Sequence, residues 1–239
     1  MRKPFFPAIK KSAENLQAFL GFRLDFVAEE SVRVFHLSMS DFGQLLLLPP
    51  LLERLRTIAP NVQVEVSSIT SNIEDELSEG LVDLAIGVSY PVKGHFFQQQ
   101  LFDSTYVGLI SKDYPAVDDV ITREQYEAVK HLTIRNQTSG FNLVNKQLES
   151  LGIHRQFAAN LSNYTYVATV LATTNYLMTT PVRVANVLIQ QARLKKVKLP
   201  FELLPMKFMQ HWHARQDLDP GNRWLRNLVA NLQPIELAF

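Results

Sequence analysis

The sequence predicts an α/β fold built from two α/β units that follow one another along the chain. Segments with the period-two pattern of strands alternate with segments that have the apolar spacing of helices, and short turns separate them. The alternation breaks near residues 103–107 and then starts again. With 239 residues, 46% hydrophobic and 20% charged, the chain is long and apolar enough to bury a sizeable core. Strand–helix–strand units with short turns favour parallel strands joined by right-handed crossovers.

The first unit is expected to contain three strands and two helices. Valines alternate with polar residues in its first two strands, as expected for half-buried strands. Ser71, followed by Glu74, predicts a capping box at the start of the second helix, and Gly80 is a candidate for the residue after its end. The expected order is strand 31–39, helix 41–59, strand 61–68, helix 71–80 and strand 82–88.

The second unit repeats the alternation with a different sequence. Pro181 suits the first position of its last helix, where a missing N–H costs nothing. The expected order is strand 105–111, helix 122–129, strand 131–134, helix 140–152, strand 155–159, helix 164–172, strand 175–180 and helix 181–193.

The end of the chain predicts one more strand and one more helix. "MKFMQHWHAR" at residues 206–215 has period two, which places His211 and His213 on one face of a strand. Asp219 and Pro220 fit the N-cap and first position of a helix that continues through "GNRWLRNLVANL".

Residues 7–20 predict an amphipathic helix that precedes the main fold. Ile9, Ala13, Leu16 and Leu20 recur at helical spacing, and Gly21 is a natural end. From periodicity alone, this apolar stripe fits equally well against the same chain or against a second chain.

Composition and motifs exclude several classes of protein. The net charge of +1 argues against an extensive nucleic-acid surface, and the absence of cysteine excludes disulfides and thiolate metal sites. We expect no signal peptide and no membrane span, because no apolar run approaches about 18 residues. The sequence contains no G-x-S-x-G, P-loop or G-x-G-x-x-G motif. His211 and His213 could chelate a metal with Asp217 or Asp219, but buried structural histidines are the favoured interpretation.

Small polar residues follow several of the predicted strands, where ligands collect in open parallel sheets. For each residue alone, helix capping is the favoured interpretation; for the group, a shared binding cleft between the two units is favoured. The loops contribute Ser40 and Asp41; Thr70 and Ser71; Asn136, Gln137, Thr138, Ser139 and Gly140; and Ser162, Asn163 and Tyr164.

Three further segments carry a resemblance to a known family. They are "VFHLSMSDFGQLLLLPPLLERLRTIAPNVQVEV", "ELSEGLVDLAIGV" and "QQLFDSTYVGLISKDYP". From about Val32 to Leu232 the chain resembles the effector-binding region of LysR-type transcriptional regulators. "HWHARQDLDPGNRWLR" is similar to the subgroup that contains regulators of nodulation and of aromatic-compound degradation. In that subgroup this stretch is part of the fold, with the last strand returning to the first subdomain.

The resemblance implies a periplasmic-binding-protein-like fold of type 2, with two Rossmann-like subdomains and a cleft between them. Subdomain 1 would comprise residues 32–103 and 207–233, and subdomain 2 residues 104–206. Residues 1–31 would be the end of a linker helix and its connection, so that residues 7–20 would pair with a partner copy in a homodimer or homotetramer. The protein would be cytoplasmic and would reach promoter DNA only through a winged helix-turn-helix, which we expect to be absent because about 30 residues precede the first strand.

The resemblance also implies a site for a small-molecule effector, an aromatic or carboxylate metabolite, and implies no catalytic residue, cofactor or metal. In this chain the loops of the second subdomain lack the histidines that family members sensing aromatic acids often have. A more neutral ligand is therefore an alternative. Asp41 would repel an anion unless it is capping or paired. The implied effector-binding residues are Ser40, Asp41, Phe42, Thr70, Ser71, Ser104, Tyr106, Asn136, Thr138, Ser139 and Asn163.

Two other functions stay open at this point. A solute-binding protein of the same fold could serve a transporter, although the missing signal peptide and the linker-like helix count against it. A metal-dependent or hydrolytic enzyme is the second alternative, and it would depend on His211 and His213.

Overall fold

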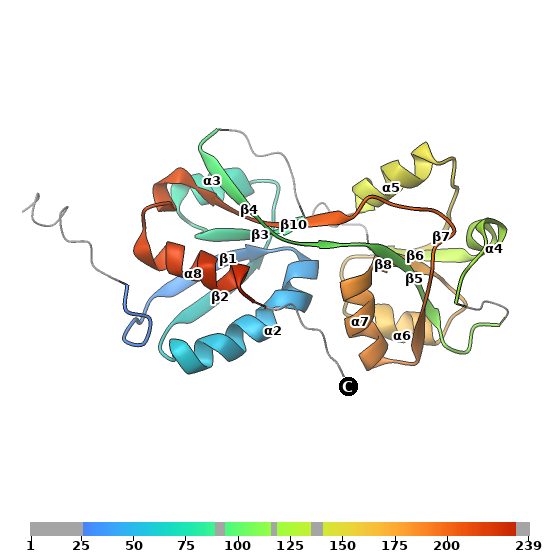
Figure 1. Cartoon of the computed structure of the whole chain (residues 1–239), viewed down its shortest axis with the longest axis horizontal. Helices are drawn as coiled ribbons and strands as arrows, with labels where there is room; N and C mark the ends of the chain where they lie inside the picture. The colour runs from blue at the N-terminus through green and yellow to red at the C-terminus, as the bar shows by residue number, and fades with distance from the viewer. Residues whose placement is uncertain (1–25, 89–93, 116–118, 135–140, 233–239) are drawn as a thin grey trace, which may run out of the picture.

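A computed structural model describes residues 26–88, 94–115, 119–134 and 141–232 of the chain, which form two lobes (Figure 1). In the first lobe lie β1 (Val34–Met39), α2 (Asp41–Ile58), β2 (Gln63–Ser68), α3 (Ile73–Glu79), β3 (Leu84–Val88), β4 (Phe96–Ser104), β10 (Met206–His213), the 3-10 turn η1 (Ala214–Gln216) and α8 (Pro220–Ala230). In the second lie β5 (Tyr106–Ser111), α4 (Arg123–Ala128), β6 (Lys130–Ile134), α5 (Phe141–Ser150), β7 (Gln156–Leu161), α6 (Val167–Ala172), β8 (Met178–Pro181), α7 (Val182–Gln191) and β9 (Leu194–Val197).

The first lobe is built on a five-stranded sheet in the order β2-β1-β3-β10-β4. β1 pairs in parallel with β2 and β3, whereas β10 is antiparallel to both β3 and β4. Helices α2 and α8 cover one face of the sheet and α3 covers the other (Figure 1). Leu46, Leu47 and Leu51 of α2 are buried against the sheet, and the helix continues through Pro49 and Pro50.

The second lobe contains a three-stranded antiparallel sheet, β8-β5-β9, and a parallel pair, β6-β7. Backbone hydrogen bonds between residues 130–132 of β6 and Leu177, just before β8, join the two, so that β6 lies beside the start of β8. The chain crosses between the lobes where β4 ends at Ser104 and β5 begins at Tyr106, and again where β10 begins at Met206. Met206 is paired with Ser104, so the two crossings lie side by side. The expected fold class is confirmed.

The strands and helices expected for residues 31–232 are present in the expected order, but β4 and β9 were not predicted. β4 is an edge strand whose Gln98, Gln99 and Gln100 are all exposed, so it has no apolar alternation to recognise. β9 has only four residues and contains Lys195 and Lys196. The amphipathic helix expected at residues 7–20 lies outside the described residues, and its pairing with a partner copy stays a prediction.

The turn before α3 differs from its expected capping box. The N-cap is Asn72, without a side-chain cap, rather than Ser71. The side chain that makes the hydrogen bonds of this turn is Thr70 instead. Its Oγ1 accepts the N–H of Asn72 at 3.1 Å and donates to the Glu76 carboxylate at 2.9 Å. Gly80 ends the helix with a φ of 79°, as expected for a left-handed terminal residue.

The histidines of the last strand are part of the scaffold. His211 is fully buried in the sheet, and burial lowers its pKa to about 4. His213, at the end of β10, accepts the N–H of Arg215 at Nδ1 and packs edge-on against Phe96. Within the described ranges, no group of three or more histidine, aspartate or glutamate side chains is arranged to hold a metal ion. The expected return of this strand to the first sheet is confirmed by its pairing with β3.

We predict that acidification destabilises the protein through two buried histidines, His131 and His211. The pKa of each falls from 6.5 to about 4, mainly through burial; for His131 the hydrogen bond to the Tyr126 carbonyl opposes this shift and the Arg155 guanidinium adds to it. The unfolded chain therefore binds more protons between these values, and stability is lost as the pH falls from 6.5 towards 4. Each histidine should contribute about 1.4 kcal/mol per pH unit to this loss.

Urea unfolding between pH 7 and pH 4.5 measures the effect. His131→Gln, which keeps a donor for the Tyr126 carbonyl that His131 Nε2 now contacts at 2.8 Å, should remove about half of the slope. Comparing the two proteins cancels the carboxylate contributions. An identical pH dependence in wild type and variant would contradict the assignment.

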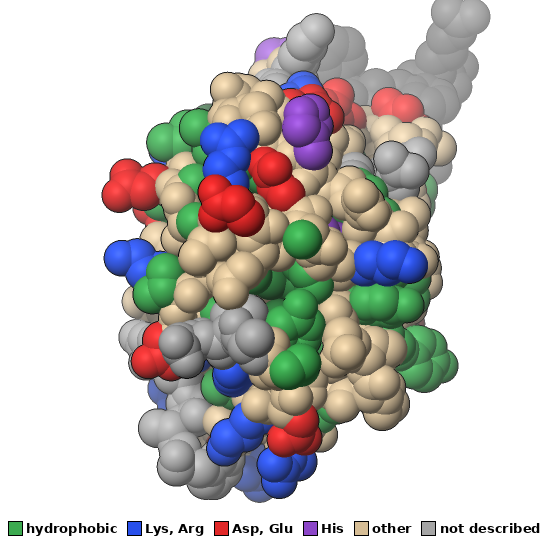
Figure 2. All heavy atoms as spheres, turned by 90° about the vertical axis from the view of Figure 1, so that its right-hand side faces the viewer, with side chains coloured by type: hydrophobic (Ala, Val, Ile, Leu, Met, Phe, Trp, Pro, Cys, Tyr) green, Lys and Arg blue, Asp and Glu red, His purple; other side chains and the backbone are tan. Residues whose placement is uncertain are grey.

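The outer surface of the second lobe carries positive and negative side chains among polar and apolar ones, and no single basic patch covers the face shown in Figure 2. Among the helices of the described part of the chain, none has the length and apolar character needed to cross a membrane.

Candidate functional site

The first loop of the site is fixed by the N-terminal end of α2. Ser40 is buried, its N–H donates to the Ile86 carbonyl at 2.9 Å, and its Oγ accepts the N–H of Gly43 at 3.1 Å. Gly43 sits where a Cβ would lie 3.1 Å from the Phe208 ring and 3.2 Å from the Ile86 carbonyl. The start of α2 is therefore held close against the sheet, with Ser40 as its N-cap.

Asp41 joins the two lobes. Its Oδ2 accepts the N–H of Tyr164, in the loop before α6, at 2.7 Å, a contact between residues 123 positions apart. Burial raises the pKa of the Asp41 carboxyl, and the hydrogen bond from Tyr164 acts in the opposite direction. A single carboxylate from the first lobe thus holds the backbone of a loop in the second.

Two buried hydroxyls of the second lobe are poorly satisfied. Tyr106 Oη has no hydrogen-bond partner, and Thr180 Oγ1 has only the Tyr164 phenol beside it. They come from adjacent strands, because Tyr106 of β5 pairs with Pro181 and Val107 pairs with Thr180 of β8. Burial raises the pKa of the Tyr106 phenol to about 12, so this side chain stays neutral.

Tyr164 brings these groups together. Burial raises the pKa of its phenol, Asp41 and Tyr106 raise it further, and the neighbouring Thr180 hydroxyl acts in the opposite direction. All three side chains therefore lie close enough to Tyr164 to act on it. We call Asp41, Tyr106, Tyr164 and Thr180 the junction cluster. It combines one carboxylate with three neutral hydroxyls, which can each donate or accept a hydrogen bond.

Other residues expected at the site have mainly structural surroundings. Phe42 is buried, with its ring centroid 4.9 Å from that of Phe208 and 6.3 Å from that of Phe102, so it belongs to the core of the first lobe. Ser104 is buried at the crossing between β4 and β5. The guanidinium of Arg183, in α7 of the second lobe, lies 4.8 Å from the ring centroid of Phe102, in β4 of the first.

The remaining expected residues lie in loops. Thr70 and Ser71 are exposed at the start of α3, and Thr70 lines a separate hollow of about 350 Å³ beside β2. Asn163 adjoins Tyr164, and its Oδ1 accepts the N–H of Thr165 at 3.0 Å, which shapes the turn. Asn136, Thr138 and Ser139 lie outside the described residues. The structure therefore places Asp41 and Tyr106 near Tyr164, with Ser40 and Asn163 adjoining the cluster in sequence, while the binding role of each expected residue stays a prediction.

Thr180 and Tyr164 were absent from the expected effector-binding residues. The sequence indicated the polar loop that contains Tyr164. It did not single out Tyr164 as a ligand-binding residue, because aromatic side chains are common in cores. Thr180 ends the strand 175–180 directly before a helix, and the rule that ligands collect at such strand ends would have included it.

Comparison with known proteins supplies the family. The family model of the LysR substrate binding domain matches residues 28–233. The HTH-type transcriptional activator NagR of a Ralstonia species is 31% identical over 91% of this chain and 73% of its own length. Nodulation protein D 3 of Rhizobium leguminosarum bv. phaseoli is 23% identical over 93% of this chain and 74% of its own length. These matches confirm the expected resemblance to the nodulation and aromatic-degradation subgroup.

A solved structure of a regulatory domain has the same fold. The regulatory domain of MexT, a transcriptional activator in Pseudomonas aeruginosa, superimposes with a TM-score of 0.74 at 26% identity, over 84% of this chain and 98% of that domain. These findings favour the regulator over the solute-binding protein and the enzyme considered from the sequence. The chain belongs to the LysR family of transcriptional regulators, of which it carries the substrate-binding, effector-sensing domain.

Proposed function

We propose that this regulatory domain binds its small-molecule effector at the junction cluster and that the bound effector sets the relative orientation of the two lobes. The observation that carries the proposal is the buried hydroxyl of Tyr106, which has no partner, together with that of Thr180, which has only the Tyr164 phenol beside it. A buried polar group without a partner costs about 1–3 kcal/mol, so poorly satisfied hydroxyls at the junction need an explanation. A ligand that hydrogen-bonds to both would recover this free energy.

The contact between Asp41 and Tyr164 links such a ligand to the orientation of the lobes. This 2.7 Å hydrogen bond spans the junction, and Tyr164 is also close to Thr180 and Tyr106. A ligand that contacts the cluster in one orientation only stabilises that orientation by its differential affinity. We place the boundary between the subdomains at residues 103/104 and 206/207, where the chain crosses between the sheets, so that both crossings act as the hinge.

The cluster also favours a type of effector. A compact polar molecule, aromatic or aliphatic, that offers a donor to Asp41 and either a donor or an acceptor to Tyr106 and Thr180 matches its chemistry. A carboxylate placed against Asp41 would be repelled while Asp41 is ionised, although burial raises the pKa of Asp41 and weakens this repulsion. We therefore favour hydroxylated, uncharged metabolites over simple carboxylates.

A thermal-shift screen of small metabolites tests the proposal. A ligand at about 100 times its Kd should stabilise the native state by about 2.7 kcal/mol. The shift should disappear in Thr180→Val, and it should persist in Thr70→Ala, whose side chain lies on an exposed loop outside the cluster. A ligand whose effect is lost in Thr70→Ala but kept in Thr180→Val would contradict this location.

A further inference from the structure

A contact between an arginine and a phenylalanine joins the two lobes beside the junction cluster. The Arg183 guanidinium, in the first turn of α7, lies 4.8 Å from the centroid of the Phe102 ring, in β4. Both side chains are half-buried. A cation that is partly shielded from water is attracted to the face of an aromatic ring, so this contact favours the orientation in which the two lobes meet.

Both ends of this contact lie close in sequence to the crossing between the lobes. Arg183 follows Thr180 of the junction cluster by three residues, and the N–H of Val182 donates to the Thr105 carbonyl at 2.8 Å. Phe102 precedes the end of β4 by two residues. A change in the angle between the lobes therefore moves the guanidinium relative to the ring.

Packed aromatic rings connect this contact to Asp41. Phe102 is stacked on Phe208, with ring centroids 4.9 Å apart and an interplanar angle of 21°, and its centroid lies 6.3 Å from that of Phe42. Phe42 directly follows Asp41, whose carboxylate makes the hydrogen bond across the junction. The two contacts between the lobes are therefore connected through the core of the first lobe.

The orientation that these contacts favour encloses the junction cluster. Tyr106 Oη and Thr180 Oγ1 are both buried. A ligand can hydrogen-bond to these atoms only after the groups around them move apart. Whatever holds the lobes together at this place therefore opposes the entry of a ligand.

We propose that Arg183 and Phe102 form a latch that keeps the junction between the lobes closed while no ligand is bound. The latch is a property of the ligand-free chain, and only its effect on effector entry rests on the proposed function. A half-buried cation–π contact should lower the population of the open junction about fivefold.

The backbone amide of Tyr164 is a direct probe of opening, because its hydrogen bond to Asp41 spans the junction at 2.7 Å. When closing is faster than exchange, the rate at which this amide exchanges its hydrogen for deuterium is proportional to the population of open molecules, even where that population is small. The amides of Asp83 and Leu132 are internal references. They donate to carbonyls within the first and the second lobe, at 2.8 and 2.9 Å.

Two variants of the full chain remove the contact from either side. Arg183→Met removes the cation and Phe102→Leu removes the ring, and both keep an apolar side chain. Each should accelerate exchange at the Tyr164 amide about fivefold. Because the contact can be lost only once, the acceleration in the double variant should be about fivefold smaller than the product of the two single effects. This comparison separates the contact from the stack on Phe208, which Phe102→Leu also disturbs.

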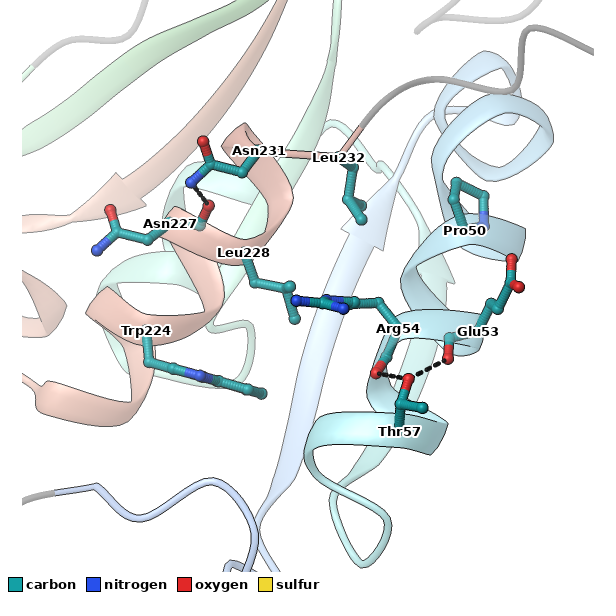
Figure 3. A pocket seen from close by; sticks show the side chains of 9 residues that line it. All are labelled: Pro50, Glu53, Arg54, Thr57, Trp224, Asn227, Leu228, Asn231 and Leu232. Atoms are coloured by element: carbon teal, nitrogen blue, oxygen red, sulfur yellow. Dashed lines mark hydrogen bonds between the residues drawn. The ribbon is translucent and has the colours of Figure 1, made fainter.

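Arg54→Met is the matched control for the loss of an arginine. Arg54 reaches from α2 towards Leu228 of α8 across a groove of about 590 Å³ (Figure 3), and both helices belong to the first lobe. The control should leave exchange at the Tyr164 amide unchanged.

Three results would overturn the latch. They are unchanged exchange at Tyr164 in both single variants, equal acceleration at the two reference amides, and single effects that multiply fully in the double variant. With an effector from the thermal-shift screen, association should also be faster in Arg183→Met than in the wild type. Faster exchange without faster association would support the latch and would contradict effector binding at the junction cluster instead.

Discussion

The double variant Tyr106→Phe/Thr180→Val is expected to be more stable than the wild type without ligand and to lose its response to the effector. Both hydroxyls are buried, Tyr106 without a partner and Thr180 with only the Tyr164 phenol beside it, and each substitution removes the hydroxyl while nearly conserving side-chain volume. Removing these two poorly satisfied groups should raise the free energy of unfolding by about 2 kcal/mol. For a domain of this size, such a gain corresponds to a rise in Tm of about 4–8 °C.

Ligand binding should change in the opposite direction, because the same hydroxyls are the proposed partners of the effector. Thermal melts with and without ligand measure both effects. Ser38→Ala is the matched control: Ser38 Oγ is also buried and unpaired, but it belongs to β1, outside the junction cluster. The control should keep the ligand-induced shift. A double variant that is less stable than the wild type would show that the hydroxyls already stabilise the ligand-free fold.

Arg226→Ala is expected to cause a large loss of stability without changing the effector site. Arg226 is 5% exposed, and its Nη1 and Nη2 donate to the Asp217 carboxylate and carbonyl at 3.0 and 3.1 Å. Its guanidinium also covers the Trp212 ring, 4.1 Å from the centroid, while Trp212 Nε1 donates to the same carboxylate. Truncation would leave Trp212 uncovered and Asp217 without its cation.

We expect Arg226→Ala to lower the free energy of unfolding by about 3 kcal/mol, at the low end for a broken buried ion pair because Asp217 is partly exposed. Arg223→Ala is the control on the same helix. Arg223 is exposed, and it would lose its contact with the Asp217 carbonyl at 3.3 Å and a weak, solvent-screened attraction to the Asp217 carboxylate, so a change below about 0.5 kcal/mol is expected. Urea unfolding measures both variants. A loss of less than about 1 kcal/mol for Arg226→Ala would contradict the role assigned to this group.

The order of strands and helices could be predicted because it depends on local patterns. Asp219 and Pro220 start α8 as expected, since capping and a fixed φ act within one turn. Helix α6 is shorter than expected and begins at Val167, because the Asn163 side chain bonds to the backbone of Thr165 and shapes a turn there. Such a side-chain turn competes with helix, and the apolar spacing does not reveal it.

The candidate site could be predicted only in part, because its contacts join distant positions. The sequence indicated Asp41 at a strand end, but not that its partner is the backbone of Tyr164, in the other lobe. Phe42 was expected at the site from the resemblance, whereas Phe208, far along the chain, provides it with a buried aromatic contact. The poor hydrogen bonding of the Tyr106 and Thr180 hydroxyls likewise depends on packing between strands and has no signature in sequence.

Amide hydrogen exchange in the presence and absence of the effector from the screen tests the central claim most directly. Binding at the junction predicts ligand-dependent protection of residues 40–43, 104–108, 162–166 and 179–182, which surround the junction cluster, with the strongest effect at the Tyr164 amide that bonds to Asp41. Residues 224–230 of α8, which lie away from the junction cluster, should exchange at unchanged rates. Protection confined to α8 or to the hollow beside β2, with the Tyr164 amide unaffected, would contradict effector binding between the lobes.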